Sequence, residues 1–360
     1  MGPTEIVGQW TDYLNTCVLS GLGAHLTRAL GLFSLGVGHA GACRSGRVAR
    51  ATPSPAMPAS RRRRWERWLA NPRFDPDRAQ RRIARAVWES WHGTRAHLLI
   101  DETARGDRVK CLTARLAYRK RALPLAWACY RPDRPPGGMV RLVNRLLARA
   151  LEHAPPGVRV VVTADRGLSW PSLVDACAAG GHHYLLRVQG QTRVRLPDGR
   201  RVAARDLAPR PGGRPWLGRA DVFQQAGWRA VSLVAIWARG CREPWLLITD
   251  QAACAGRWRE YARRMWIEEA IRDDKSQGLE WDRSRVGDPR RVARLHVILA
   301  LAALLAVSLG TWLIKRGLRH ELDPRRRRRL SVFQLGLQAL ASMLAGLRPN
   351  WPLQMTFHPT

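Results

Sequence analysis

The sequence predicts an α/β protein built around a mixed sheet. Two short apolar segments that each end in an acidic residue, His97–Asp101 and Val158–Asp165, are separated by strand-like and helix-like segments. The second is rich in β-branched residues without polar alternation, which is typical of a strand buried on both faces. Consecutive strands form a meander, whereas strands separated by helices pair in parallel. Both patterns are present, so we expect antiparallel and parallel pairs in one sheet.

The first 91 residues are expected to form a helical N-terminal region. Apolar stretches interrupted by Gly predict short helices over residues 1–50, and the Pro/Ser-rich segment Thr52–Ser60 predicts a linker. Arg61–Leu69 and Asp77–Trp91 predict two Arg-rich helices, the first interleaved with Trp. Arginines beside aromatic residues are typical of DNA-binding surfaces, so residues 1–91 are interpreted as a DNA-binding region. The alternative is a basic, solvated helix pair packed on the main domain.

Residues 92–188 contain the first part of the expected core. Its predicted elements are three strands, a helix, a strand, a helix and a strand: His97–Asp101, Val109–Arg119, Ala122–Tyr130, Val140–His153, Val158–Asp165, Trp170–Ala179 and His182–Val188. Residues 189–228 interrupt this order. They are rich in Gly, Pro and Arg and contain only short strand-like pieces, Thr192–Leu196 and Arg201–Ala204. This composition predicts an inserted β-rich lobe.

Residues 229–320 are expected to complete the core, and residues 321–360 to form a C-terminal helical region. The predicted elements of these two parts are strands Arg229–Ala238 and Trp245–Thr249, helix Arg257–Lys275, a loop, the long apolar helix Leu295–Ile314 and the amphipathic helix Ser331–Leu347. Five consecutive arginines, Arg325–Arg329, precede the last helix.

The apolar segment Leu295–Ile314 has about the length that a bilayer requires. His296, the interruption at Ser308–Gly310 and dense Arg on both flanks argue against a membrane span. We therefore expect a buried core helix, with a membrane anchor as the alternative.

The charge balance predicts a polyanionic partner. The 360-residue chain carries 61 Lys and Arg against 28 Asp and Glu, a formal net charge of +33. So many positive side chains repel one another unless a polyanion neutralises them, and nucleic acid is the leading class of polyanionic partner. Nearly all of the positive charge is Arg, whose planar guanidinium suits bidentate phosphate contacts. Most of these residues are nevertheless expected to be ordinary solvated surface.

The cysteine pattern predicts a reduced, cytoplasmic protein. The seven cysteines form no CxxC pair, and no His pair has zinc-finger spacing. We expect them to be reduced and mostly buried. The N-terminus also lacks the basic and apolar regions of a signal peptide.

The segment Arg257–Lys275 carries an unusual polar stripe. Tyr261, Arg264, Glu268 and Lys275 have offsets of 0, 3, 7 and 14. At about 100° per residue they fall within about 60° of one another on an α-helix. A solvated face with an Arg264–Glu268 pair would explain such a stripe on its own. The acids upstream indicate a second explanation.

Three acids form a candidate metal site. Asp101 and Asp165 each end a predicted strand, and Glu268 lies on the stripe of the helix expected to pack nearby. Convergent carboxylates repel one another unless cations neutralise them, and oxygen ligands suit Mg²⁺ or Mn²⁺. Two such ions can activate a water or a 3′-hydroxyl and stabilise the leaving oxygen of a phosphodiester. Taken singly, Asp101 and Asp165 could equally be turn caps.

These residues together resemble the DDE transposases of bacterial insertion sequences, in the group marked by Tyr-x2-Arg-x3-Glu-x6-Lys. The stripe fills that signature without a gap, and the segments LLIDET and VVTADRG are similar to the first-acid and second-acid strands of the family. The segment SVFQLGLQAL also resembles the family, and the resemblance covers roughly residues 61–347. Met265 where many members have Trp, and Ile271 where many have Phe, are departures that suggest a subgroup.

The resemblance implies an RNase H-like catalytic core with a β-rich insertion between the second Asp and the Glu. It implies that Asp101, Asp165 and Glu268 are catalytic and hold two Mg²⁺ or Mn²⁺ ions. It also implies cut-and-paste transposition: the chain binds terminal inverted repeats in double-stranded DNA, nicks the element ends and joins the 3′-OH to target DNA, as a homodimer in a bacterial cytoplasm at the nucleoid. The better-known members pass through a DNA hairpin.

The resemblance assigns Tyr261, Arg264 and Lys275 to phosphates near the cleaved end. On a continuous helix, Lys275 and Tyr261 lie about 10 Å from Glu268 on opposite sides, too far for Lys275 to touch the metals. Other acids nearby are interpreted as supporting or solvated: Glu102, Glu269, Asp273 and Asp274. A flipped base, as hairpin formation requires, would be held by Trp170, Trp216 or Trp228.

Two alternatives to an active transposase remain. A decayed relative of the same fold would bind DNA without cleaving it. An Arg-rich nucleic-acid-binding or membrane-associated protein without enzymatic activity would need neither metal nor the three acids.

Overall fold

The computed structural model describes residues 2–324, 326, 328–348 and 351–358. Its centre is a ten-stranded mixed sheet with the strand order β3-β2-β1-β4-β5-β10-β9-β8-β6-β7. The strands are β1 (Arg95–Arg105), β2 (Val109–Tyr118), β3 (Arg121–Tyr130), β4 (Arg159–Ala164), β5 (His183–Arg187), β6 (Arg193–Arg195), β7 (Arg201–Ala203), β8 (Trp216–Val222), β9 (Arg229–Ile236) and β10 (Trp245–Thr249). The predicted α/β class is confirmed.

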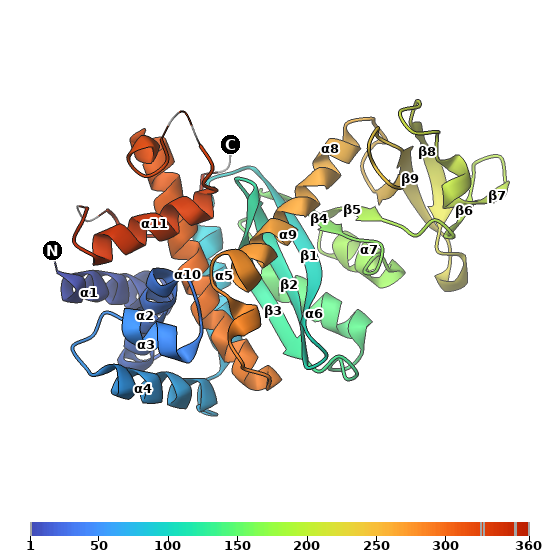
Figure 1. Ribbon diagram of the computed structural model, residues 1–360. Coiled ribbons are helices and arrows are strands. Elements are labelled where there is room, and N and C mark those ends of the chain that lie inside the picture. Colours follow the sequence, from blue (N-terminus) through green and yellow to red (C-terminus); the bar gives the residue numbers. More distant parts are fainter. Residues whose placement is uncertain (1, 325, 327, 349–350, 359–360) are drawn as a thin grey trace.

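Helices lie around this sheet and form a second body beside it (Figure 1). They are α1 (Pro3–Tyr13), α2 (Ala24–Ala40), α3 (Ser45–Ala51), α4 (Pro58–Ala70), α5 (Pro76–Glu89), α6 (Met139–Leu151), α7 (Pro171–Ala179), α8 (Arg257–Tyr261), α9 (Met265–Arg272), α10 (Pro289–Lys315) and α11 (Val332–Leu344). In Figure 1 the N-terminal helices lie at one end of the molecule and β6–β9 at the other.

The sheet mixes both kinds of pairing as the sequence predicts. β1, β2 and β3 form an antiparallel meander, while β4 runs parallel to β1 and β5 runs parallel to β4. The last paired residues of β1 and β4 are Ile100 and Ala164. This register decides where the two acids that follow them lie.

The region 189–228, which we expected to form an inserted β-rich lobe, contributes β6, β7 and β8 to one end of the sheet. β8 pairs with β9 along its whole length, and β6 pairs with β8. β6 and β7 agree with the predicted strand-like pieces, whereas β8 had no prediction. Gly218 within β8 and the Pro-rich segment before it conceal the strand pattern in the sequence.

The N-terminal region is helical, and one helix is longer than expected. α2 continues through Gly31 and Gly36, which were interpreted as breaks. A Cβ at Gly31 would lie 2.7 Å from Thr11 Oγ1, and one at Gly36 would lie 2.4 Å from Thr52 Oγ1. These glycines therefore permit close packing inside a continuous helix.

The two tryptophans of α4 are buried, which corrects one part of the DNA-binding interpretation. Trp65 and Trp68 are 2% and 6% exposed and pack edge-on against Phe33 of α2. They are part of the core and offer no free ring face for a base. Only the arginines of this helix remain as candidates for contact with DNA.

The long apolar helix α10 lies in the interior and packs against α2, α11 and β3. It is the single helix among the described residues that is long and apolar enough to cross a membrane, and 89% of its apolar window is buried within the protein. The expectation of a buried core helix is confirmed.

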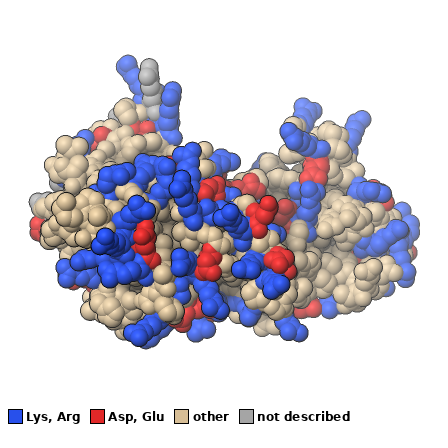
Figure 2. All heavy atoms as spheres, turned by 60° about the horizontal axis from the view of Figure 1, so that its bottom comes forward, with Lys and Arg blue, Asp and Glu red and all other residues tan. Residues whose placement is uncertain are grey.

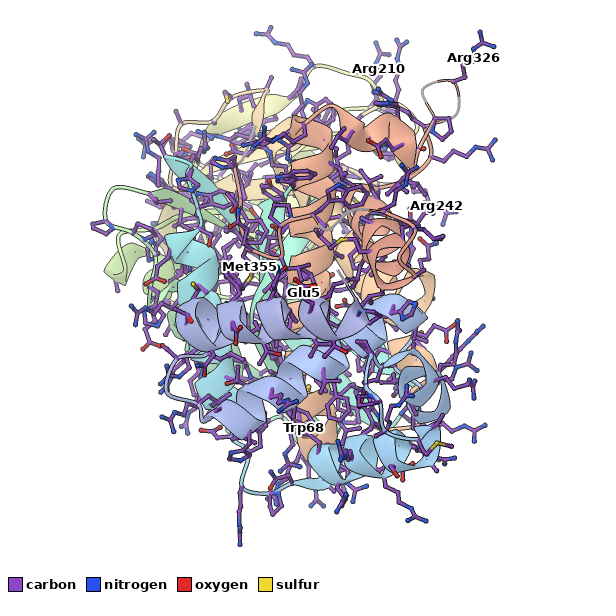
Figure 3. The ribbon with its side chains drawn as sticks, turned by 90° about the vertical axis from the view of Figure 1, so that its left-hand side faces the viewer. Glu5, Trp68, Arg210, Arg242, Arg326 and Met355 are labelled. Carbon is purple, nitrogen blue, oxygen red and sulfur yellow. The ribbon has the colours of Figure 1, made fainter. Side chains whose placement is uncertain are left out.

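The C-terminal helix α11 agrees with the prediction. Of the five arginines that precede it, Arg325 and Arg327 lie outside the described residues, and Arg326 extends away from the ribbon in Figure 3. All seven cysteines are free, but only Cys43, Cys111 and Cys177 are buried, so the expectation of mostly buried thiols is wrong.

Candidate active site at the end of two parallel strands

Asp101 and Asp165 occupy equivalent positions on neighbouring strands. Each follows directly after the last β1–β4 pair, Ile100 with Ala164. Neighbouring strands lie about 4.8 Å apart, so the two acids begin side by side. β1 itself continues to Arg105 because it still pairs with β2, where Asp101 faces Thr113. Asp101 therefore marks the end of the parallel pairing, whereas we expected it to end the strand.

The predicted helix Arg257–Lys275 is divided into four short pieces. α8 is followed by a 3₁₀ turn, η4 (Ala262–Arg264), then by α9 and by a π turn, η5 (Asp273–Gln277). The angular stripe that we calculated for a regular α-helix therefore does not hold over its full length. Its first three members still converge, whereas the fourth does not.

Arg264 lies between the acids. Its guanidinium forms ion pairs with Asp165, at 3.3 Å from Nη2 to Oδ2, and with Glu268 through Nη1. Its side chain is only 10% exposed. Asp101 also interacts electrostatically with Arg264, so one buried cation serves all three carboxylates.

Two further residues hold Asp165. The Tyr261 hydroxyl donates to Asp165 Oδ1 at 3.3 Å, and Tyr261 is 3% exposed. Arg187 Nη1 lies 3.9 Å from the same oxygen. Arg187 had no place in the sequence prediction. It ends β5, the next strand of the parallel set, and that position was a usable signal.

The two strand-end acids have opposite pKa shifts. Burial raises the pKa of Asp101, and repulsion from Glu268 and Asp165 adds to this, although Arg264 opposes it. Burial also acts to raise the pKa of Asp165, but Arg264, the Arg166 N–H and Arg187 together hold it below its ordinary value. Asp101 is thus repelled by the other two carboxylates and attracted by Arg264, and burial is the main cause of its raised pKa.

The three carboxylates form an open group in this structure. In the described part of the chain, one set of three His, Cys, Asp or Glu residues brings its ligand atoms within 4.8 Å of one another. That set lies elsewhere and does not include these carboxylates. A hollow of about 420 Å³ opens beside Asp165 and is lined by Arg166, Gly167, Gln189, Gly190 and Gln191. The Glu268 side chain is 41% exposed, which leaves it free to change rotamer.

Lys275 points away from the acids. Its Nζ donates to the Ala104 carbonyl at 2.8 Å and lies 3.7 Å from Asp282. The π turn η5 carries it toward the end of β1. The structure therefore brings Tyr261, Arg264 and Glu268 together with Asp101 and Asp165 and leaves Lys275 at the margin.

Two neighbouring acids are buried, which excludes a solvated role for them. Asp273 pairs with Arg121 of β3, and Asp274 pairs with Arg115 of β2 at 2.5 Å. Asp273 and Asp274 are 2% and 5% exposed, and burial raises the pKa of Asp273 to about 7. These ion pairs fix the end of the helical segment to the sheet. Glu102 and Glu269 pair with Lys110 and Arg272, respectively.

Replacement of Asp274 by Ala is expected to destabilise the protein by about 3–5 kcal/mol, because it leaves the buried Arg115 guanidinium without a counter-charge. The measurement is the free energy of unfolding in urea. Glu66→Ala is the control: Glu66 pairs with Arg62 on the surface, so its loss should cost less than about 1 kcal/mol. Equal effects of the two substitutions would contradict the burial argument.

Basic side chains line a groove near the site. Figure 2 shows Lys and Arg over much of one face, with fewer acids among them. A groove of about 920 Å³ runs between α3, α4 and the start of α10, and seven arginines and three acids line it: Arg44, Arg47, Arg50, Arg62, Arg283, Arg285 and Arg291, with Glu66, Asp282 and Asp288. Asp282 also contacts Lys275, so this arginine groove begins beside the margin of the acid site.

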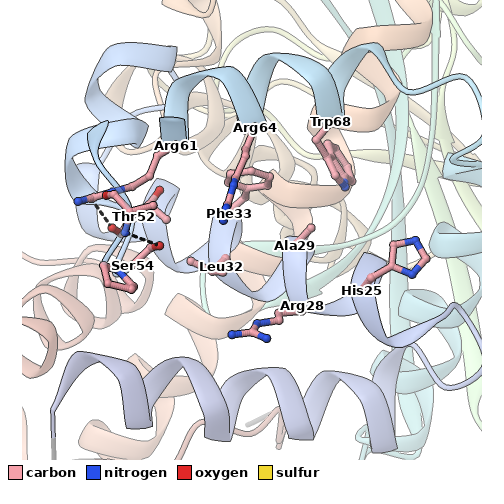
Figure 4. Close-up of a pocket in the computed structure, with 12 residues that line it drawn as sticks. His25, Arg28, Ala29, Leu32, Phe33, Thr52, Ser54, Arg61, Arg64 and Trp68 are labelled. Carbon is pink, nitrogen blue, oxygen red and sulfur yellow. Dashed lines mark hydrogen bonds between the residues drawn. The ribbon is translucent and has the colours of Figure 1, made fainter. Parts of the chain in front are cut away.

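A separate hollow of about 750 Å³ lies between α2 and α4 (Figure 4). Its lining includes Arg28 and Arg64 together with the apolar side chains of Leu32 and Phe33. Arg61 is already engaged, since it donates to the carbonyls of Ala49 and Thr52. None of the three acids lines this hollow.

The three candidate tryptophans differ in their surroundings. Trp170 and Trp216 are half-buried and pack against the core. Trp228 is half-buried in the β6–β8 region and is covered by the guanidinium groups of Arg195 and Arg201, at 4.9 and 5.8 Å from the ring centre. The geometry does not distinguish one of them as a base-holding residue.

Comparison with known proteins adds no family assignment. No protein-family model matches the chain, and a search of curated proteins finds no significant relative.

Proposed function

We propose that the chain is a DDE transposase with an RNase H-like core. The observation that carries the proposal is the convergence of Asp101, Asp165 and Glu268 on one buried arginine. Two of these acids lie at equivalent ends of adjacent parallel strands, and the third arrives on the helical segment with the Tyr-x2-Arg-x3-Glu-x6-Lys spacing. The mixed sheet flanked by helices supports the RNase H-like assignment of the core.

The donor set of the acid site fits divalent cations with a preference for oxygen. Asp101, Asp165 and Glu268 would hold Mg²⁺ or Mn²⁺, and two ions supply a metal-activated nucleophile and charge stabilisation at the leaving oxygen. The carboxylates of Glu268 and Asp165 repel that of Asp101, and a bound cation would relieve this repulsion. Glu268, partly exposed, has the freedom to turn from Arg264 toward such a cation.

The chain's other residues would position the acids and the DNA. Tyr261 and Arg187 orient Asp165 from two sides. Arg264 limits the repulsion among the acids when no substrate is bound. When DNA is bound, its guanidinium would be able to form an ion pair with a phosphate instead. Lys275 and the arginine groove extend the positive surface along which a duplex backbone would lie.

The assignment as a transposase predicts metal-dependent cleavage at the element ends. Incubation of the protein with DNA that carries the flanking inverted repeats should give strand cleavage with Mg²⁺ and none with EDTA. Joined products should follow when target DNA is present. Binding without cleavage in Mg²⁺ would instead favour the decayed, DNA-binding alternative.

Assembly and location belong to the same proposal. We expect a homodimer that holds two element ends in a synaptic complex in the bacterial cytoplasm. Paired-end complexes that contain two protein chains, measured by mass photometry, would test this expectation.

A further inference from the structure

A second cluster of ligand-type side chains lies away from the acid site. Cys111 on β2 faces Cys129 on β3 directly across the antiparallel pair, and their sulfurs are 3.6 Å apart. His296 of α10 packs over them, and one ligand atom from each of the three lies within 4.8 Å of the others. A strand pair and a helix from distant parts of the chain thus converge on one point.

One ring nitrogen of His296 is buried without a hydrogen-bond partner among the described residues. His296 is 5% exposed, and its Nε2 has no hydrogen-bond partner in the part of the chain that the structure describes. The rings of Trp281 and Trp127 pack beside it, with centroids 4.6 and 6.3 Å away. A buried ring nitrogen without a partner carries a desolvation cost, which a bound ion would offset.

We propose that Cys111, Cys129 and His296 form a zinc site. Two thiolates bound to tetrahedral zinc at about 2.3 Å are about 3.8 Å apart, close to the observed sulfur spacing. A disulfide needs about 2.05 Å and would require the sulfurs to approach by more than about 1 Å. Two thiols in simple contact would also show this spacing, but they would leave the buried Nε2 atom of His296 without a hydrogen-bond partner in the described chain.

The contact between the sulfurs agrees with this site. The Cys129 thiol donates a hydrogen bond to the Cys111 sulfur, and both thiols lose their protons when they bind a metal as thiolates. Thiolate and imidazole donors select zinc over Mg²⁺, so this site and the acid site would take different ions. Three protein ligands leave a fourth position for water.

A zinc ion here would fasten α10 to the β2–β3 hairpin. Cys111 faces Thr103 of β1, two residues beyond the pair formed by Asp101 and Thr113. The clamp would therefore hold the strands that flank Asp101 against the central helix. This role is structural and does not depend on the proposed transposase activity.

The test is metal content of the full-length protein after reconstitution with Zn²⁺ and removal of excess metal. The exposed thiols Cys17 and Cys254 are first replaced by Ser in every sample, to exclude adventitious binding. We expect one zinc per chain in this background. Cys111→Ser, Cys129→Ser and His296→Ala should each abolish stoichiometric binding, whereas Cys177→Ser, which alters a buried thiol in α7, should retain it.

A Co²⁺-substituted sample gives a readout that is independent of folding defects in the variants. The unmutated cluster should show thiolate-to-cobalt charge-transfer absorption, which added Zn²⁺ removes. Zinc content near zero in the reconstituted background, the absence of that absorption, or a Cys111–Cys129 disulfide in protein kept under reductant would each overturn the proposal.

Discussion

Replacement of Asp165 by Asn is expected to reduce Mg²⁺-dependent cleavage of element ends by about a thousandfold or more. The substitution keeps the shape of the side chain but removes a charged metal ligand. Loss of a metal-held charge costs several kcal/mol of transition-state stabilisation, and each 1.36 kcal/mol is about tenfold in rate. The measurement is the single-turnover cleavage rate at saturating protein. Asp101→Asn and Glu268→Gln are expected to behave in the same way.

Binding should separate from cleavage in these variants. Asp165→Asn removes a negative charge beside Arg264, so affinity for the DNA ends should be unchanged or higher, as measured by fluorescence anisotropy. Asp175→Asn is the matched control, because Asp175 forms a surface ion pair with Arg229 and should leave the rate within about twofold. Cleavage by Asp165→Asn at close to the unmodified rate would remove Asp165 from the catalytic set.

Much of the core could be predicted from the sequence because its signals are local. The apolar β-branched run before Asp165 and the meander of β1–β3 are visible in short windows, and their pairing follows from chain order. The acids at the strand ends follow from the same register. In contrast, the position of β8 depends on pairing with β9, which no local pattern specifies.

The helical segment after β10 shows where regular geometry misleads. Its composition predicts one helix, but tertiary contacts impose a 3₁₀ turn at Ala262–Arg264 and a π turn at Asp273–Gln277. The π turn places Asp273 and Asp274 against Arg121 and Arg115, and these buried pairs outweigh the regular helical hydrogen bonds. The direction of Lys275 follows from this irregularity, so it was not predictable from spacing.

The cluster of Cys111, Cys129 and His296 could not be predicted from the sequence, because its three residues come together only in the folded chain. Sequence signatures of zinc sites consist of closely spaced cysteines and histidines. These three residues instead meet through a cross-strand pair and through α10, which begins 159 residues after the end of β3. The β2–β3 register brings the sulfurs together, and the burial of α10 brings the imidazole. Only the tertiary structure contains that information.

Replacement of Gly336 by Ala is expected to destabilise the protein by about 3 kcal/mol or more, measured as the free energy of unfolding in urea. α11 crosses α10 with the two backbones in contact: a Cβ at Gly336 would lie 1.7 Å from the Ala306 carbonyl oxygen, and one at Gly310 would lie 1.9 Å from the Val332 carbonyl oxygen. Overpacking a core usually costs about 1–3 kcal/mol when side chains can shift. Here the obstacle is helix backbone, so the helices themselves must separate.

Gly8→Ala in α1 is the matched control for this crossing. A Cβ at Gly8 meets nothing within 4 Å, so the substitution should be neutral or should stabilise the helix by up to about 1 kcal/mol. Gly310→Ala should act like Gly336→Ala, and the double variant should cost less than the sum, because once the helices have separated the second methyl group finds space. A stable Gly336→Ala protein would show that α10 and α11 do not cross at this distance, and the burial of α10 would then need another explanation.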